Sequence, residues 1–167
     1  MLKRLMASLV LLSAGAIFSC SDADKKAAGQ RQNAVATVEA FDIHGVSHHL
    51  GEWIGKRPVV LNFWGTWCGP CRREVPDLVR LYSEYSPRGI EMLGLAVNDH
   101  PDKVAQFIRQ FGMDWVMLMA SREITIKYGI FSGIPQTIFI DRNGQEVKRF
   151  VGAQSYQTLQ QGFEAIL

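Results

Sequence analysis

The sequence predicts an α/β domain in which a mixed β-sheet carries helices on both faces. Three observations predict this fold class. Hydrophobic residues make up 47% of the 167 residues, which is enough to bury a core. The nearly continuous apolar run at 58–64 is typical of a buried central strand. Strand and helix patterns then alternate and end in a hairpin and a helix, an order that favours parallel neighbours with an antiparallel edge.

Residues 1–19 have the pattern of a secretory signal peptide. Lys3 and Arg4 precede an apolar run from Leu5 to Phe18, which is too short for a comfortable transmembrane helix. Removal of this segment lowers the count of Lys and Arg from 18 to 16, against 16 Asp and Glu. The domain then has no net charge, so we do not expect nucleic acid as a partner. Export would place it in an oxidising compartment.

The signal segment ends in a sequence that resembles the lipobox of bacterial lipoproteins. Ile17 and Ser19 stand at suitable positions before Cys20, whereas Phe18 is larger than the residue usual there. The resemblance implies cleavage before Cys20 and attachment of lipid to its sulfur. Ordinary cleavage after residues 14–16, or an uncleaved anchor, is the alternative.

The lipidated cysteine is expected to continue into a flexible tether over 20–35. These residues are mostly small, polar and charged, and they show no apolar period. The globular domain is therefore placed at 36–167. Its first segments, 36–41 and 46–50, flank a turn at 42–45 and predict a small β-hairpin.

A helix is predicted over 70–86, directly after the central strand. Pro70 suits the first helical turn. Pro76 lies inside the apolar pattern and predicts a kink. The apolar positions of this helix are spaced three and four residues apart, and they are Val75, Leu78, Val79 and Tyr82.

The remaining elements follow from the same patterns. An apolar strand is predicted at 90–97, and a helix at 101–112 opens at Pro101 and stops at Gly112. The Asn143-Gly144 pair is a strong hairpin signal. The other predicted elements are a strand at 115–119, a helix at 122–128, the hairpin strands 136–140 and 145–151, and a last helix with Leu159, Phe163 and Ile166.

Candidate chemistry lies where the central strand gives way to the helix, at Cys68-Gly69-Pro70-Cys71. Two cysteines three positions apart can close a small disulfide ring. The free amides of a helix start favour a thiolate on Cys68, which would attack a disulfide. Cys71, expected to be less exposed, would then attack Cys68 and release the product.

Two other interpretations of these cysteines are weaker. Zinc usually needs four ligands, and the only other cysteine lies at the signal segment. The four histidines (44, 48, 49 and 100) lack paired ligand spacing, and His48-His49 is expected to be a solvated part of the hairpin. No metal is therefore predicted. A purely structural disulfide across so short a loop would stabilise the fold only modestly.

Residues 62–76 read NFWGTWCGPCRREVP, and residues 133–144 read GIPQTIFIDRNG. Both segments resemble the exported thioredoxin-like proteins of the TlpA/ResA type, which are close to the cytochrome c maturation thioredoxins. The resemblance covers 36–167 and implies a thioredoxin fold with an N-terminal β-hairpin extension. It also implies a membrane-tethered thiol–disulfide oxidoreductase on the periplasmic side of a membrane, whose redox group is a Cys68–Cys71 disulfide and which needs no other cofactor.

The resemblance also implies a substrate-binding surface around the cysteines. It places Ile134 and Pro135 beside them, with the peptide bond between the two in the minority cis state. The backbone of Ile134 would then be free to pair with an extended substrate strand. Gly69 and Pro70 would belong to the same surface, and Trp67, next to Cys68, is a further candidate for docking.

Glu74 is the candidate proton acceptor. It follows Cys71 by three positions and so shares a helix face with it. Burial would raise the pKa of its carboxyl and let it take a proton from Cys71, and the family carries a functional glutamate here. The alternative is a solvated glutamate beside Arg72 and Arg73. Asn62 stands where cytoplasmic thioredoxins carry a buried aspartate, so the proton relay is absent there or has moved to Glu74.

The Gly-Pro dipeptide between the cysteines is the one found in reducing thioredoxins, so a reductase is favoured over an oxidant. The expected partners are disulfide-bearing client proteins, apocytochrome c among them, and a transmembrane thiol reductant. A copper metallochaperone is one alternative, but it would want a wider cysteine spacing and a histidine near the loop before the last hairpin. A thiol peroxidase is another, and it needs an isolated peroxidatic cysteine.

Overall fold

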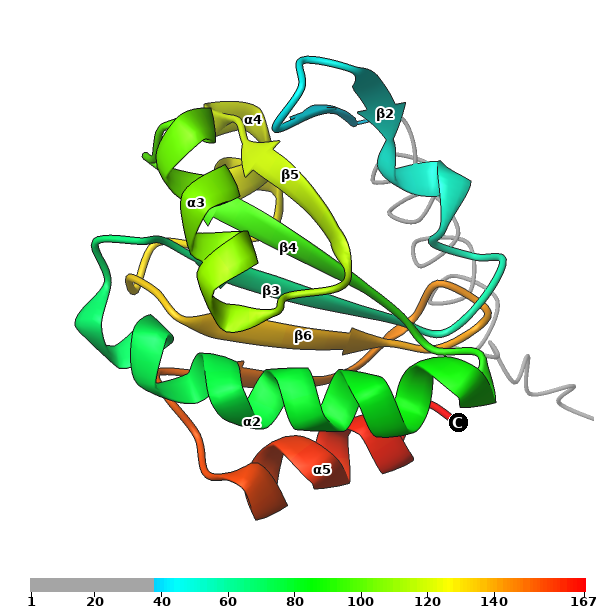
Figure 1. The fold of residues 1–167 in the computed structure, drawn as a ribbon. Coiled ribbons are helices and arrows are strands. Elements are labelled where there is room, and N and C mark those ends of the chain that lie inside the picture. Colours follow the sequence, from blue (N-terminus) through cyan, green and yellow to red (C-terminus); the bar gives the residue numbers. More distant parts are fainter. Residues whose placement is uncertain (1–37) are drawn as a thin grey trace, which may run out of the picture.

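The computed structural model describes residues 38–167; the predicted signal segment, Cys20 and the tether lie outside them. A seven-stranded sheet in the order β2-β1-β5-β4-β3-β6-β7 forms the centre (Figure 1). In chain order the elements are β1 (Glu39–Asp42), β2 (Ser47–His49), η1 (Leu50–Glu52), β3 (Val59–Trp64), α2 (Gly69–Tyr85), η2 (Ser86–Arg88), β4 (Glu91–Val97), α3 (Pro101–Phe111), β5 (Val116–Ala120), α4 (Arg122–Lys127), β6 (Gln136–Ile140), β7 (Glu146–Val151) and α5 (Tyr156–Glu164).

The sheet is mixed, as predicted. β3 pairs with β4 and β4 with β5 in parallel, joined by the crossover helices α2 and α3. β6 pairs antiparallel with both β3 and β7, so the closing hairpin supplies the antiparallel edge. The N-terminal hairpin joins the same sheet at the other edge, where Phe41 of β1 faces Met119 of β5. All six residues of β3 are buried, which agrees with its predicted central place.

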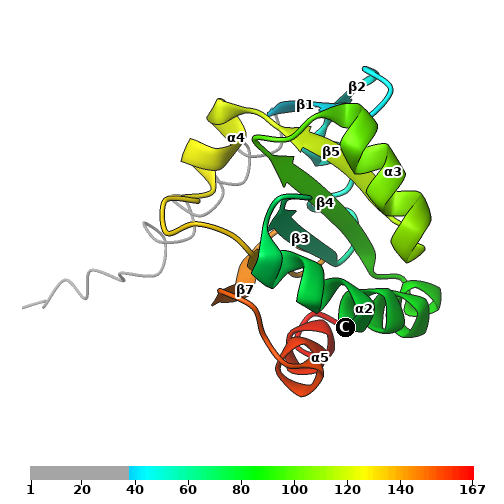
Figure 2. The same cartoon turned by 60° about the vertical axis from the view of Figure 1, so that its left-hand side comes forward.

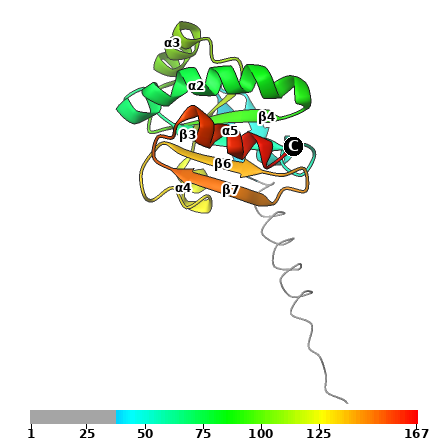
Figure 3. The same ribbon diagram turned by 90° about the horizontal axis from the view of Figure 1, so that it is seen from below.

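Helices cover both faces of the sheet, also as predicted. Side chains on α2, α3 and α5 share one core with Val60 and Trp64 of β3. Leu61 and Phe63 of β3 point to the other face, where α4 and the N-terminal segment cover them. Figure 2 shows α4 across the sheet from α2, α3 and α5, and Figure 3 shows the same division from below.

The start of α2 is set by local chemistry. Cys68 is the N-cap residue, and its sulfur accepts a hydrogen bond from the amide of Cys71. Pro70 occupies the first turn, where a missing amide hydrogen costs nothing. The helix runs through Pro76 without a break and buries Val75, Leu78, Leu81 and Tyr85. The end of the buried strand β3 and the start of α2 therefore place the two cysteines at one end of the sheet.

Close packing fixes α5 against the sheet. Gly162 of α5 is buried, and a Cβ atom at this position would lie 2.3 to 2.6 Å from atoms of the Phe139 ring. Phe163 packs edge-on against the same ring, with centroids 5.6 Å apart. The absence of a side chain at Gly162 is therefore what lets the helix approach β6 so closely.

Substitution Gly162→Ala is expected to destabilise the fold by about 1–2 kcal/mol. Alanine improves helix propensity by up to about 1 kcal/mol. Overpacking a core costs about 1–3 kcal/mol, and so close a contact puts the cost at Gly162 toward about 3 kcal/mol. Urea unfolding would measure the difference, with Gln161→Ala on the exposed side of α5 as the control, expected within about 0.5 kcal/mol of wild type. A Gly162→Ala variant as stable as wild type would contradict this account of the packing.

Candidate active site

Cys68 and Cys71 form a disulfide, with their Cα atoms 5.3 Å apart. The amide of Cys71 donates to the Cys68 sulfur at 3.2 Å. Cys68 is 4% exposed and Cys71 is 1% exposed, so Cys71 is the more buried, as predicted, although both sulfurs are largely covered. The helix start and this amide favour negative charge on Cys68 once the bond is reduced. The arrangement suits a first sulfur that attacks and a second that resolves.

The loop before β6 lies against the first sulfur. The Ile134–Pro135 peptide bond is cis, as predicted, and the carbonyl oxygen of Ile134 lies 3.6 Å from the Cys68 sulfur. The side chain of Gln136 donates to the carbonyl of Gly133 at 2.9 Å and so holds this loop to the start of β6. Ile134 is half-buried, which leaves part of it facing solvent beside the disulfide.

Trp67 forms an exposed rim next to Cys68. The residue is 59% exposed, although the indole Nε1 donates to the backbone carbonyls of Val97 at 3.1 Å and Asn98 at 3.2 Å. Gly69 and Pro70, on the first turn of α2, are exposed as well. These residues and Ile134 surround the disulfide. The surface that they form is exposed to solvent, whereas the two sulfurs themselves are almost fully covered.

Glu74 is buried, so the alternative of a solvated first-turn glutamate is wrong. It is 2% exposed, and its Oε1 accepts a hydrogen bond from the amide of Gln154 at 3.0 Å. Within the part of the chain that the structure describes, Oε2 has no partner. Burial raises the pKa of the carboxyl to about 7; the bond from Gln154 lowers the pKa, and the nearby Asp77 carboxylate raises it. Near neutral pH such a carboxyl can both accept and release a proton.

Asn62 replaces an ionisable group in the middle of β3. It is buried on the same side of the strand as Trp64, and its Nδ2 donates to the hydroxyl of Thr137 at 3.0 Å. Its oxygen has no partner among the residues the structure describes. Because an amide does not titrate, Glu74 is the buried group of this region that can take up a proton.

Sequence reasoning missed two contacts that shape the site. Asp99 accepts hydrogen bonds from the amide and the hydroxyl of Thr66, which lies 33 positions earlier. Gln154 reaches Glu74 from 80 positions away. Neither contact leaves a local pattern, since each depends on which loops meet at this end of the sheet. An acidic residue just after the apolar strand was the only available signal for Asp99.

The histidine pair of the N-terminal hairpin is not assembled into a metal centre. His48 lies 3.6 Å from an oxygen of Asp42 and 3.4 Å from one of Glu52, as a surface ion-pair network would place it. Residues 38–167 contain no group of three or more side chains arranged to hold a metal ion. Over the same residues, no helix combines the length and the hydrophobicity that crossing a membrane requires.

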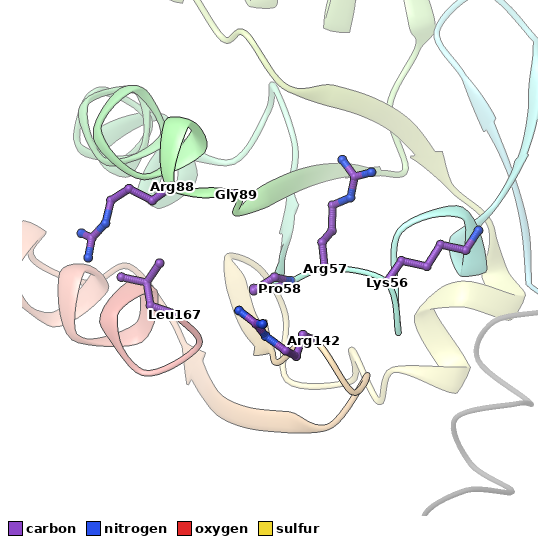
Figure 4. A pocket seen from close by; sticks show the side chains of 7 residues that line it. All are labelled: Lys56, Arg57, Pro58, Arg88, Gly89, Arg142 and Leu167. Carbon is purple, nitrogen blue, oxygen red and sulfur yellow. The ribbon is translucent and has the colours of Figure 1, made fainter.

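A basic cavity of about 250 Å³ lies away from the disulfide (Figure 4). It lies where α2 ends and β3 begins, so the 17 residues of α2, a length of about 25 Å, separate it from the cysteines. In Figure 4 the charged ends of Lys56, Arg57 and Arg88 point in different directions and do not converge on one point with that of Arg142. We therefore do not include it in the candidate site. It is lined by Lys56, Arg57, Pro58, Arg88, Gly89, Arg142 and Leu167.

The chain matches a known protein family and is similar in sequence to known thiol–disulfide oxidoreductases. A family model described as redoxin matches residues 27–166. The chain is similar to the thiol-disulfide oxidoreductase ResA of Geobacillus thermodenitrificans (strain NG80-2), with 35% identity over 126 residues that cover 75% of this chain and 71% of that protein. It is also similar to the ResA of Halalkalibacterium halodurans, with 34% identity over 145 residues that cover 86% of this chain and 81% of that protein.

A solved structure shows the same architecture. It is a thiol:disulfide interchange protein of the thioredoxin family from Chlorobium tepidum TLS, with a TM-score of 0.70 and 26% identity. The match covers 79% of this chain and 94% of that one. The predicted thioredoxin-like fold and the predicted resemblance to ResA-type proteins are both confirmed.

The burial of Glu74 predicts how stability depends on pH. The pKa of its carboxyl is about 7 in the folded protein, against an ordinary value of 4.5 for a solvated glutamate. As pH rises from about 4.5 to 7, the unfolded chain loses this proton first, so the free energy of unfolding falls, by up to about 3 kcal/mol. Glu74→Gln removes this dependence. The free energy of unfolding of the variant should therefore rise relative to that of wild type across this pH window and then level off.

Urea unfolding of the oxidised protein at several pH values would measure the advantage of the Gln variant. Glu123→Gln, at an exposed carboxylate on α4, is the matched control and should show no such growth. A difference between Glu74→Gln and wild type that stays constant from pH 4.5 to 7 would show that Glu74 ionises like a solvated group.

Proposed function

The chain belongs to the redoxin family and is a ResA-like thiol–disulfide oxidoreductase, and from this premise we propose that it reduces disulfides of client proteins outside the cytoplasm. The observation that carries the proposal is the Cys68–Cys71 disulfide at the start of α2, with the Cys71 amide directed at the Cys68 sulfur. The Gly-Pro dipeptide between the cysteines supports a reductase rather than an oxidant.

In the first step the reduced protein uses Cys68 as the nucleophile. The Cys68 thiolate attacks one sulfur of the client disulfide, and the client's other sulfur leaves as a thiolate. A mixed disulfide between Cys68 and the client results. The helix start and the amide of Cys71 favour negative charge on the Cys68 sulfur, and the thiolate is the form that attacks.

In the second step Cys71 releases the client. The Cys71 thiol gives its proton to the Glu74 carboxylate, and the resulting thiolate attacks the Cys68 sulfur. The bond between Cys68 and the client breaks, and the client sulfur leaves as a thiolate that takes a proton from solvent. Two electrons have then passed from the protein dithiol to the client, and the protein is left with the disulfide that the structure shows.

The surface around the disulfide suits an extended client segment. The backbone of Ile134 lies against the Cys68 sulfur, where a client strand can pair with it. Trp67 offers an apolar face beside Cys68, and Phe131, three residues before Ile134, is 75% exposed. Gly69 and Pro70 leave room for the client above the first turn of α2. Exposed aromatic side chains of this kind are the usual anchors of protein interfaces.

We place the domain on the periplasmic side of a membrane, held by a lipid on Cys20 through the tether at 20–35. The support is the signal-like segment at 1–19 and its lipobox-like end. Apocytochrome c is the proposed client, because its haem-attachment thiols must be free and the chain resembles cytochrome c maturation thioredoxins. Each turnover leaves the protein oxidised, so a transmembrane thiol reductant is the proposed electron donor.

Trapping tests the assignment of the two cysteines. Cys71→Ser should hold its client on Cys68 as a mixed disulfide, because the resolving thiol is absent. The complex can be isolated without reductant, and mass spectrometry would identify the client. Cys68→Ser is the matched control and should trap far less, since Cys71 is the more buried of the two and the amide faces the Cys68 sulfur instead. Equal trapping by both variants would contradict the assigned order of attack, and failure of Cys71→Ser to hold any protein through a disulfide would contradict the proposed reaction.

Lipid attachment is tested separately. The mature protein should begin at Cys20 and partition into detergent, because each buried methylene of an acyl chain contributes about 0.8 kcal/mol. Mass spectrometry of the N-terminal peptide would show the added lipid mass. Cys20→Ala should lose that mass, whereas Ser21→Ala should keep it. A mature N-terminus downstream of Cys20, or a fully soluble mature protein, would refute the anchor.

A further inference from the structure

The carboxylate of Asp99, in the loop between β4 and α3, holds the residues just before the disulfide. Its Oδ2 accepts a hydrogen bond from the amide of Thr66 at 2.6 Å, and its Oδ1 accepts one from the Thr66 hydroxyl at 2.9 Å. Oδ1 also accepts from the amide of His100, the N-cap residue of α3, at 2.9 Å. Asp99 therefore ties the start of α3 to the segment that ends in Cys68.

The same loop fixes the indole ring of Trp67. The ring's only polar atom, Nε1, donates to the carbonyls of Val97 and Asn98, the two residues before Asp99. Asn98 has a φ of 47°, in the left-handed region that asparagine tolerates better than most residues. Trp67 as a residue nevertheless stays 59% exposed. It is thus held by its edge while much of its surface faces solvent.

Gly65 makes room for this arrangement. A Cβ atom at Gly65 would lie 2.9 Å from Nε1 of Trp67 and 3.4 Å from Cδ1 of Ile134. The indole and the Ile134 side chain therefore both lie against the backbone of Gly65. Loops after β3, after β4 and before β6 meet here, beside the Cys68 sulfur.

We propose that Asp99 is a positioning residue that holds the Trp67 indole in the orientation a protein client contacts; the proposal rests on the proposed function above. Asp99 bonds to Thr66, and Thr66 precedes Trp67 in the chain, so the carboxylate fixes the backbone from which the indole extends. A side chain that is ordered before binding loses less entropy when a partner binds it. An aromatic anchor held in this way raises affinity for an extended client without touching the sulfur chemistry.

Two other roles for Asp99 make different predictions. If it only stabilises the start of α3, its loss should lower stability and affect every substrate equally. If its charge acts on the Cys68 thiol, its loss should change reaction with any disulfide, whatever its size. The positioning role alone predicts that large clients are affected and small disulfides are not.

The test compares Asp99→Ala with wild type, both as the full chain in reduced form. Insulin serves as the protein disulfide and bis(2-hydroxyethyl) disulfide as the small one, and each rate is measured against substrate concentration. Hydrogen exchange of the Trp67 indole N–H, followed by NMR, reports the position of the ring directly. Asp102→Ala is the matched control, because Asp102 is an exposed carboxylate on the first turn of α3 that faces His100 rather than Thr66.

For Asp99→Ala we expect the half-saturating concentration of insulin to rise about tenfold, which corresponds to about 1.4 kcal/mol. The limiting rate with insulin and the rate with the small disulfide should stay within about twofold of wild type, and indole exchange should accelerate. Asp99→Asn keeps an acceptor for Thr66 and should restore most of the affinity. Thr66→Val, which loses only the hydroxyl bond, should show an intermediate shift and keeps the test valid if Asp99→Ala fails to fold.

Two outcomes would overturn the proposal. One is an Asp99→Ala variant that matches wild type in insulin affinity and indole exchange. The other is an equal loss of rate with both disulfides, which would assign Asp99 to the thiol chemistry or to the fold. A wild-type chain that reduces neither disulfide would refute the proposed function instead, and the indole exchange rates would still decide whether Asp99 positions Trp67.

Discussion

A backbone amide directed at a sulfur atom is the contact on which the active site depends. The amide of Cys71 reaches the Cys68 sulfur because the buried strand β3 ends and α2 begins within a few residues. That junction makes Cys68 the helix cap, buries Cys71 in the first turn and puts Glu74 one turn further along the same helix. One local event, the start of a helix at the end of a central strand, therefore places the proposed nucleophile, the proposed resolving thiol and the proposed proton acceptor.

The surroundings of this junction come from distant parts of the chain. Glu74 is held by the amide of Gln154, just before α5, and the Cys68 sulfur faces the carbonyl of Ile134. Asp99 joins the loop after β4 to Thr66. Burial without a full set of partners is what raises the pKa of Glu74, so the acid–base property of the site depends on how α2 and the segment before α5 pack.

Sequence patterns predicted the elements and the chemistry of the site better than its long-range contacts. Apolar runs, helix periodicity and turn signals were enough to locate β3, α2 and the closing hairpin, because each depends on neighbouring residues. The Cys68–Cys71 pair and the burial of Glu74 followed from spacing and from the resemblance to a known family. The pairing of β1 with β5 and the bonds of Asp99 and Gln154 were not predicted, since they join residues far apart in sequence and leave no local period.

The order of the strands also affects how the protein meets unfolded polypeptides. A sheet with two free edges offers unpaired amides and carbonyls to any extended chain, a hazard for a protein that handles such chains. Here one edge is β2, only three residues long, and the other is β7, which carries Glu146, Lys148 and Arg149. Short length and charge both discourage edge-to-edge pairing. Among the residues that the structure describes, this leaves the Ile134 backbone beside the disulfide as the proposed place where an extended client pairs.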